Sequence, residues 1–235
     1  MKYMGSKNRY AKYILPIILK HRTDWYVEPF VGGANIIDKV GGNRMGADVN
    51  PYVIEALKLI RDTPHTIPDL ISEDDYEKAK KEMHMDGMTG FTGFAMSFGG
   101  KWFGGYRRDK AGTKGNIENM RTQTRRSKQA AYTQSPKLEG VILEAKHYLD
   151  LSIPSNSIIY CDPPYANTTK YKGSFDHAIF WNWVREKSKY HKVYVSEYTA
   201  PDDFNILWEK PVNSNLDVKS KGRQRVERLY SLDFE

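Results

Sequence analysis

The chain has 235 residues and a formal net charge of +7. This length suits one sizeable α/β domain with room for an insertion, and it allows an ordinary buried core. A single cysteine, Cys161, excludes an internal disulfide framework and favours a reducing compartment. Because no stretch reaches the roughly 18 apolar residues of a membrane span, and no signal-type apolar run opens the chain, we expect a cytoplasmic protein without a membrane partner.

The first third of the chain alternates predicted helices and strands. A helix is expected over 7–20, shortened or kinked by Pro16, and "WYVEPF" is expected to be a strand. The turn "VGGAN" should open a helix at about Ile36, and "RMGADVN" reads as a second strand that ends at Asp48. Next, "PYVIEALKLIRD" predicts a helix with Pro51 in its first turn. This order favours an α/β fold with a parallel sheet and helices on both faces.

The alternation stops between residues 64 and 136, which are polar and rich in glycine, lysine and arginine. A helix is expected over 73–83, with Ser72 and Asp75 in the positions of a capping box. A second helix is expected near 116–132. We therefore interpret 64–136 as a mostly helical insertion into a domain formed by 1–63 and 137–235.

The alternation resumes after the insertion. "GVILEAKHYLDL" precedes the expected strand "SIIYCDPPY", a helix near 176–189 follows, and "KVYVSEY" is a further strand. The segments "NILWEKPV" and "RVERLYSL" predict two strands that pair as a hairpin at the edge of the sheet.

Most of the excess charge lies in the insertion. Between Lys101 and Lys128 nine cations face two acids, which makes this window +7 and leaves the rest of the chain neutral in sum. Trp102, Phe103 and Tyr106 are interleaved with these cations. Cations for phosphates and rings for bases are typical of a nucleic-acid-binding loop, and the alternative is a solvated surface loop. The aromatic residues could wedge into a duplex or form the small core of the insertion.

Two glycines and an acid suggest a nucleoside site. Gly32 and Gly33 follow a predicted strand, where the lack of a side chain lets a ligand approach the backbone. Their spacing differs from the G-x-G-x-x-G of a dinucleotide site. Asp48 ends the next strand, where a carboxylate can accept both hydroxyls of a ribose. A nucleoside without a diphosphate fits both features; the alternative for each is a tight turn and a helix-capping acid.

The stretch "DPPY" at 162–165 ends a buried strand with an acid, two prolines and a ring. Asp162 and the carbonyl of Pro163 can each accept an N–H of an adenine amine, which frees the nitrogen lone pair for attack. Pro164 fixes the backbone, and Tyr165 can lie flat against the base. Because a paired base cannot reach such a site, this chemistry requires base flipping. The alternative is an ordinary turn after a strand.

In content and order these motifs resemble the Dam-type (D12 class) N6-adenine DNA methyltransferases. The resemblance covers nearly the whole chain except about 64–136, which corresponds to the family's target-recognition insertion. It implies a Rossmann-like methyltransferase fold with a mixed sheet, S-adenosylmethionine as cofactor with S-adenosylhomocysteine as product, no metal, and double-stranded DNA as partner. It also implies the catalytic residues Asp162, Pro163, Pro164 and Tyr165.

The resemblance assigns cofactor contacts as well. "KYMGSK" contributes Tyr3 and Lys7, "EPFVGGAN" contributes Phe30, Gly32 and Gly33, and the others are Asp48, Tyr148, Asp162 and Tyr171. The sequence departs from the family at His147, where many members have an acid that binds the cofactor adenine. It also departs at Ala34, where the family has glycine; we expect Gly33 to supply the needed backbone freedom.

Base-reading residues are not carried over from the family. The DNA-binding candidates come from the basic window: Lys101, Trp102, Tyr106, Arg107, Arg108, Arg121, Arg125 and Arg126. Two other functions stay open: a methyltransferase acting on RNA adenine or another amine or amide, and a non-catalytic DNA-binding protein on a methyltransferase scaffold. Without a long hydrophobic seam we expect a monomer, encoded by a bacterium or a phage.

Overall fold

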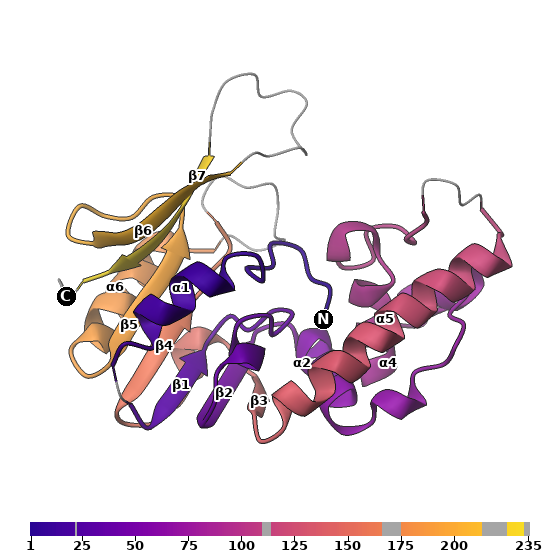
Figure 1. Ribbon diagram of the computed structural model, residues 1–235, viewed down its shortest axis with the longest axis horizontal. Helices are drawn as coiled ribbons and strands as arrows, with labels where there is room; N and C mark the ends of the chain where they lie inside the picture. Colours follow the sequence, from indigo (N-terminus) through magenta and orange to yellow (C-terminus); the bar gives the residue numbers. More distant parts are fainter. Residues whose placement is uncertain (22, 110–113, 166–174, 213–224, 233–235) are drawn as a thin grey trace.

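The computed structural model describes residues 1–21, 23–109, 114–165, 175–212 and 225–232. Its centre is a seven-stranded sheet in the order β3-β2-β1-β4-β5-β7-β6 (Figure 1). The strands are β1 (Trp25–Glu28), β2 (Asn43–Asp48), β3 (Ile142–Ala145), β4 (Ser157–Cys161), β5 (Lys192–Glu197), β6 (Asn205–Val212) and β7 (Arg225–Ser231). Strands β1 to β5 run parallel, and β7 pairs antiparallel with both β5 and β6. The mixed sheet and the edge hairpin confirm the predictions.

Alternate residues of the central strands enter two different cores. In β4, Ile158 and Tyr160 join the core that contains α1 (Ala11–Ile18) and α2 (Pro51–Asp62). Ile159 and Cys161 join the core on the other face, which contains α6 (His177–Ser188). Because neighbouring side chains of a strand point to opposite faces, a strand buried on both sides reads as a continuous apolar run. The prediction of helices on both faces is confirmed.

Helix α2 begins at a residue that caps it. The side chain of Asn50 accepts a hydrogen bond from Tyr52 N at the start of α2, and Pro51 occupies the first turn. The predicted helix from Ile36 is wrong, because only a single 3₁₀ turn, η1 (Ile37–Lys39), forms there. The following Gly41 and Gly42 lead directly into β2, which leaves too few residues for an α-helix.

The predicted insertion contains the helices α3 (Glu73–Glu82), α4 (Gly87–Ala95) and α5 (Ile117–Leu138). Helices α4 and α5 pack on α2, and α3 packs on α4. The capping box of Ser72 and Asp75 at the start of α3 is confirmed. Helix α5 continues to Leu138, beyond the predicted end near residue 132, and its buried side chains share a core with α2. The 3₁₀ turns η2 (Pro64–Thr66), η3 (Phe98–Gly100) and η4 (Tyr148–Asp150) complete the elements.

Helix α4 is absent from the sequence predictions, and its glycines explain why. Glycine lowers helix propensity, and three occur in nine residues. A Cβ at Gly90 would lie 2.2 Å from the carbonyl oxygen of Tyr52, and one at Gly87 would lie 2.7 Å from that of Glu55. The glycines thus allow the backbones of α4 and α2 to approach closely. None of the helices in the described part of the chain is long and apolar enough to cross a membrane.

Candidate active site

The predicted site residues gather at the carboxyl edge of the parallel strands. Asp48 is the last residue of β2, and Asp162 directly follows β4, while β1 lies between these two strands. The chain leaves β1 toward β2 on one side and β4 toward β5 on the other, so the strand order reverses between β1 and β4. Crevices at such reversal points are where open α/β sheets bind ligands.

Both carboxylate oxygens of Asp48 hold the neighbouring loops. Oδ2 accepts a hydrogen bond from Gly32 N at 3.2 Å, and Oδ1 accepts one from Asn50 N at 2.9 Å. Burial nevertheless raises the pKa of Asp48 to about 6, although the two backbone donors act in the opposite direction. An acid whose pKa is raised by burial in this way, at the carboxyl edge of the parallel strands, is a candidate for ligand binding.

The glycine-rich loop after β1 packs against the start of the chain. A Cβ at Gly32 would lie 2.9 Å from the Tyr3 ring, and one at Gly33 would lie 2.6 Å from the carbonyl oxygen of Met1. The left-handed conformations fall on Gly32, with φ of 47°, and on Ala34, with φ of 56°. The expectation that Gly33 supplies the backbone freedom is therefore wrong, and Ala34 holds a conformation that costs an alanine roughly 1–2 kcal/mol.

A cluster of rings lies beside this loop. The Phe30 ring centre is 5.2 Å from that of Tyr148 and 5.9 Å from that of Phe175, and His147 lies 4.5 Å from Tyr148. Tyr148 is buried, whereas Phe30 and His147 are partly exposed. The structure thus brings together Phe30 and Tyr148, two of the rings assigned to the cofactor. Tyr171, the third such ring, lies outside the described residues.

Lys7 connects the Asp-Pro-Pro-Tyr stretch to Glu227 on β7. Its Nζ lies 3.0 Å from Asp162 Oδ1 and 3.4 Å from Glu227 Oε1, and it sits 4.3 Å from the centre of the Tyr165 ring. The Tyr165 hydroxyl donates a hydrogen bond to Glu227. The side chains of Lys7 and Glu227 are 7% and 5% exposed, whereas that of Asp162 is 23% exposed. Among the three charged residues of this cluster, Asp162 is therefore the one that a ligand can reach.

The electrostatics of the cluster follow from one ammonium between two carboxylates. Burial lowers the pKa of Lys7, but Asp162 and Glu227 more than offset that effect, so its net pKa is raised and the ammonium stays charged. Burial raises the pKa of Asp162, and Lys7 cancels part of the rise. Burial likewise raises the pKa of Glu227, and the Asp162 charge adds to it. The cluster can therefore take up a proton more readily than separate solvated carboxylates.

Glu227 is the site residue that the sequence analysis missed. It lies on β7, and its side chain points to the same face as the buried Leu229, two residues further on. An acid in the inward phase of a strand is a usable sequence signal, because buried acids are rare unless they are paired. Tyr198 after β5 completes this side of the site, with its ring edge-to-face with Tyr165 at 4.6 Å.

A comparison with known protein families gives one match. Residues 3–135 fit the family model described as D12 class N6 adenine-specific DNA methyltransferase, which is more than half of the chain. The chain belongs to this family. The match includes the insertion, the part for which the motif resemblance was weakest, and it ends before the Asp-Pro-Pro-Tyr stretch, whose role therefore rests on its geometry.

A curated relative of this D12 class chain is the type II methyltransferase M.FokI of Planomicrobium okeanokoites. The two are 22% identical over 213 residues, which cover 79% of this chain and 31% of the relative. The chain thus spans about a third of the length of the curated relative that it matches.

In this D12 class chain the aromatic residues of the basic window form a core. Trp102 packs against Phe94, with ring centres 4.6 Å apart, and lies equally close to Phe103. Tyr106 is buried, and its hydroxyl donates a hydrogen bond to the carbonyl oxygen of Ile71 at 2.6 Å. These contacts favour the core interpretation over the wedge for Tyr106.

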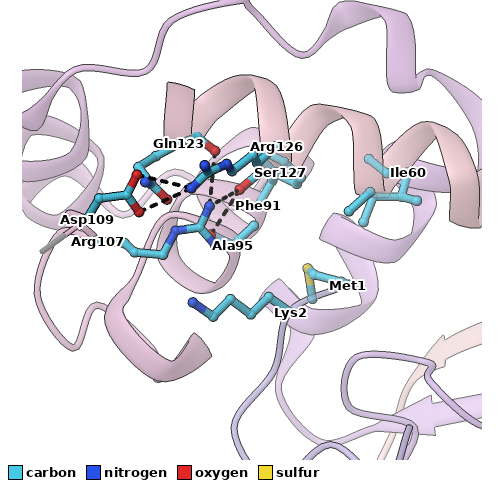
Figure 2. Close-up of a pocket in the computed structure, with 12 residues that line it drawn as sticks. Met1, Lys2, Ile60, Phe91, Ala95, Arg107, Asp109, Gln123, Arg126 and Ser127 are labelled. Atoms are coloured by element: carbon cyan, nitrogen blue, oxygen red, sulfur yellow. Dashed lines mark hydrogen bonds and ion pairs between the residues drawn. The ribbon is translucent and has the colours of Figure 1, made fainter. Parts of the chain in front are cut away.

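Several predicted DNA-binding cations have partners within the insertion. Arg107 donates to Gln123 O and Ser127 Oγ, and Arg126 binds both oxygens of Asp109 (Figure 2). Arg108 binds Glu73 with two nitrogens. Arg121 pairs with Glu118 at 3.4 Å. Lys101 and Arg125 are exposed. The DNA contacts of these cations stay predictions. Among the described residues no cluster of three or more His, Cys, Asp or Glu could hold a metal ion.

Proposed function

We propose that this chain transfers a methyl group from S-adenosylmethionine to the exocyclic amine of an adenine in double-stranded DNA, and that the adenine is flipped out of the duplex to reach the site. Membership of the D12 class supports the reaction type. The single observation that carries the assignment is the position of Asp162 and Pro163 at the carboxyl end of β4, with Lys7 in contact with the acid.

The residues around the loop after β1 fit the proposed cofactor. Asp48 offers carboxylate lone pairs beyond those that its two backbone donors use, so it can accept the ribose hydroxyls. Phe30, just before the glycine-rich loop, and Tyr148 provide apolar ring surface. S-adenosylmethionine supplies a methyl group that its sulfonium already activates, so the protein has mainly to align the reacting atoms and exclude water.

The catalytic stretch activates the amine through two fixed acceptors. The lone pair of the adenine amine is delocalised into the ring, and an acceptor on each N–H draws the nitrogen toward tetrahedral geometry. Lys7 holds Oδ1 of Asp162, so we assign one N–H to Oδ2 and the other to the carbonyl oxygen of Pro163. Pro163 and Pro164 restrict the backbone that presents both acceptors.

Glu227 and Lys7 position Tyr165 for the base. The hydrogen bond from the phenol to Glu227 and the ammonium above the ring hold its orientation before the substrate arrives. A ring held in this way can stack on a flipped base and offset part of the cost of unpairing it. The methylated amine must then lose a proton, and Asp162, whose pKa burial raises, lies where it can accept that proton.

The test is methyl transfer from labelled S-adenosylmethionine to unmethylated duplex DNA, with digestion to nucleosides and mass detection of N6-methyladenine. Asp162→Ala should abolish the product while cofactor binding stays detectable. Asp202→Ala removes an exposed acid outside the site and should behave as wild type. A wild-type rate in Asp162→Ala would refute the catalytic assignment.

Two outcomes would redirect the proposal. Product on RNA or on another amine but not on DNA would keep the cofactor site and replace the substrate. DNA binding without cofactor binding or methyl transfer would favour a binding protein on a methyltransferase scaffold. We further propose that the chain acts as a monomer inside the cell, where its DNA substrate is found.

A further inference from the structure

A cavity of about 340 Å³ lies between the start of the chain and the insertion. One wall is Met1 and Lys2, the floor is apolar and includes Ile60 and Phe91, and the opposite wall is formed by α5 and the loop before it (Figure 2). None of these residues belongs to the active site described above. The cavity joins the N-terminal segment, which carries Lys7, to the insertion.

The charges that line the cavity do not balance. Its lining contains the cations Lys2, Arg107 and Arg126 and a single acid, Asp109. Both oxygens of Asp109 bind Arg126, at 3.0 and 3.1 Å. The charge of Asp109 also acts on Arg107, but this one carboxylate faces three cations in the described lining. Burial lowers the pKa of Lys2, and the nearby charge of Arg107 lowers it further. An anion between the two would relieve this repulsion.

Two of the residues that line the cavity, Arg107 and Gln123, have hydrogen-bond donors without acceptors among the described residues. Arg107 is fixed to α5, because its Nη2 donates to Gln123 O at 3.1 Å and to Ser127 Oγ at 3.2 Å. Its Nε and the Nε2 of Gln123 are buried and have no hydrogen-bond partner within the described part of the chain. Gln123 is only 2% exposed. Leaving a buried donor unpaired is unfavourable, and a small side-chain shift would let a ligand rich in acceptor oxygens accept hydrogen bonds from both residues.

The cavity lies close enough to the active site for a DNA strand to reach both. Lys2 is five residues before Lys7, which contacts Asp162. Five residues span at most about 18 Å, and successive phosphates of one strand are spaced by about 3.4 Å along the duplex axis. Because the lysine side chains add to this backbone span, a phosphate at Lys2 would lie within roughly one helical turn of DNA from a base in the active site.

We propose that this cavity binds a phosphate group, and that its source is the DNA backbone close to the target adenine. The inference rests on the proposed function for the identity of the DNA. It assigns Arg107 to a phosphate rather than to a base edge, and it adds Lys2 and Gln123 to the DNA-binding residues. Contacts of this type position a protein on the duplex without reading sequence.

The test is the salt dependence of binding to a fluorescent duplex for wild type, Lys2→Gln and Lys137→Gln. Lys2 and Lys137 are both exposed, and Lys137 lies in the last turn of α5, outside the cavity. Lys2→Gln should lower the magnitude of the slope of log K against log salt by about 0.9, because one phosphate contact is lost. Lys137→Gln should keep the wild-type slope, and cofactor affinity should be unchanged in both variants.

A second arm titrates the DNA-free protein with inorganic phosphate by calorimetry. If the slope of Lys2→Gln equals that of wild type while phosphate binds wild type and not Lys2→Gln, the site takes a free anion and the DNA source is overturned. Unchanged slopes without phosphate binding overturn the site altogether. Both outcomes apply only if the wild-type protein binds DNA. A wild-type protein that neither binds nor methylates DNA would refute the proposed function instead.

Discussion

Asp48 should couple cofactor binding to pH. Its pKa is raised from 3.8 to about 6 by burial, so at pH 5 most molecules carry a protonated Asp48. Ribose hydroxyls donate hydrogen bonds to the ionised carboxylate, so binding favours the charged form and should release a proton. With a pKa near 6, the ionised fraction rises about tenfold between pH 5 and pH 7, and cofactor affinity should rise by the same factor.

The same shift affects stability with the opposite sign. A carboxyl whose pKa is raised in the folded state binds more protons there than in the unfolded chain, so its stabilising contribution is present below pH 4. It is lost as the pH rises through about 6, and the full difference of 2.2 pH units, from 3.8 to 6, corresponds to at most about 3 kcal/mol. Asp48→Asn does not titrate, so the variant does not lose this contribution to stability as the pH rises. The unfolding free energy of Asp48→Asn, relative to that of wild type, should therefore be higher at pH 7 than at pH 4.

Calorimetric titration with S-adenosylhomocysteine at pH 5, 6 and 7 checks the prediction for binding, and urea unfolding at pH 4 and at pH 7 checks the prediction for stability. Asp48→Asn should bind about 10- to 100-fold more weakly at pH 7, because a hydrogen bond to a charged group contributes about 1.5–3 kcal/mol. Its affinity should no longer change with pH. Asp202→Asn serves as the control. A wild-type affinity that is constant from pH 5 to pH 7, or a tenfold change that persists in Asp48→Asn, would refute the reasoning.

Three further predictions concern the catalytic cluster and the insertion. Glu227→Gln should lower the methylation rate about tenfold or more and move the acidic limb of the pH–rate profile to lower pH, since one carboxylate near Asp162 loses its charge; an unmoved limb would argue for a purely structural role. Gly90→Ala should lower the unfolding free energy by about 1–3 kcal/mol, because its Cβ would lie 2.2 Å from a carbonyl oxygen of α2, while Gly41→Ala, with open space around it, should not; urea unfolding decides. Tyr106→Phe should cost about 1–3 kcal/mol of stability but leave DNA affinity unchanged, and a selective loss of DNA affinity would instead support a DNA contact.

The elements that local rules control could be predicted from the sequence. Strands buried on both faces are continuous apolar runs, and the starts of α2 and α3 carry a capping residue and a capping box. Helix α4 could not be predicted, because its glycines disfavour a helix locally and are explained only by the close approach of α2. The helix expected after the glycine loop does not form, because the connection into β2 is short and has room for only one 3₁₀ turn.

The sequence by itself indicated the Asp-Pro-Pro-Tyr stretch after one strand and the acid at the end of another. The structure places both at one sheet edge, because parallel strands have their carboxyl ends on the same side. Only the tertiary structure decided that Glu227 joins Lys7 and Asp162, and that Arg107 and Tyr106 are anchored inside the insertion. These contacts join segments far apart in the chain, and each depends on how a whole layer packs. Local sequence patterns carry the periodicity of a strand or a helix, but they do not specify which distant side chain lies opposite.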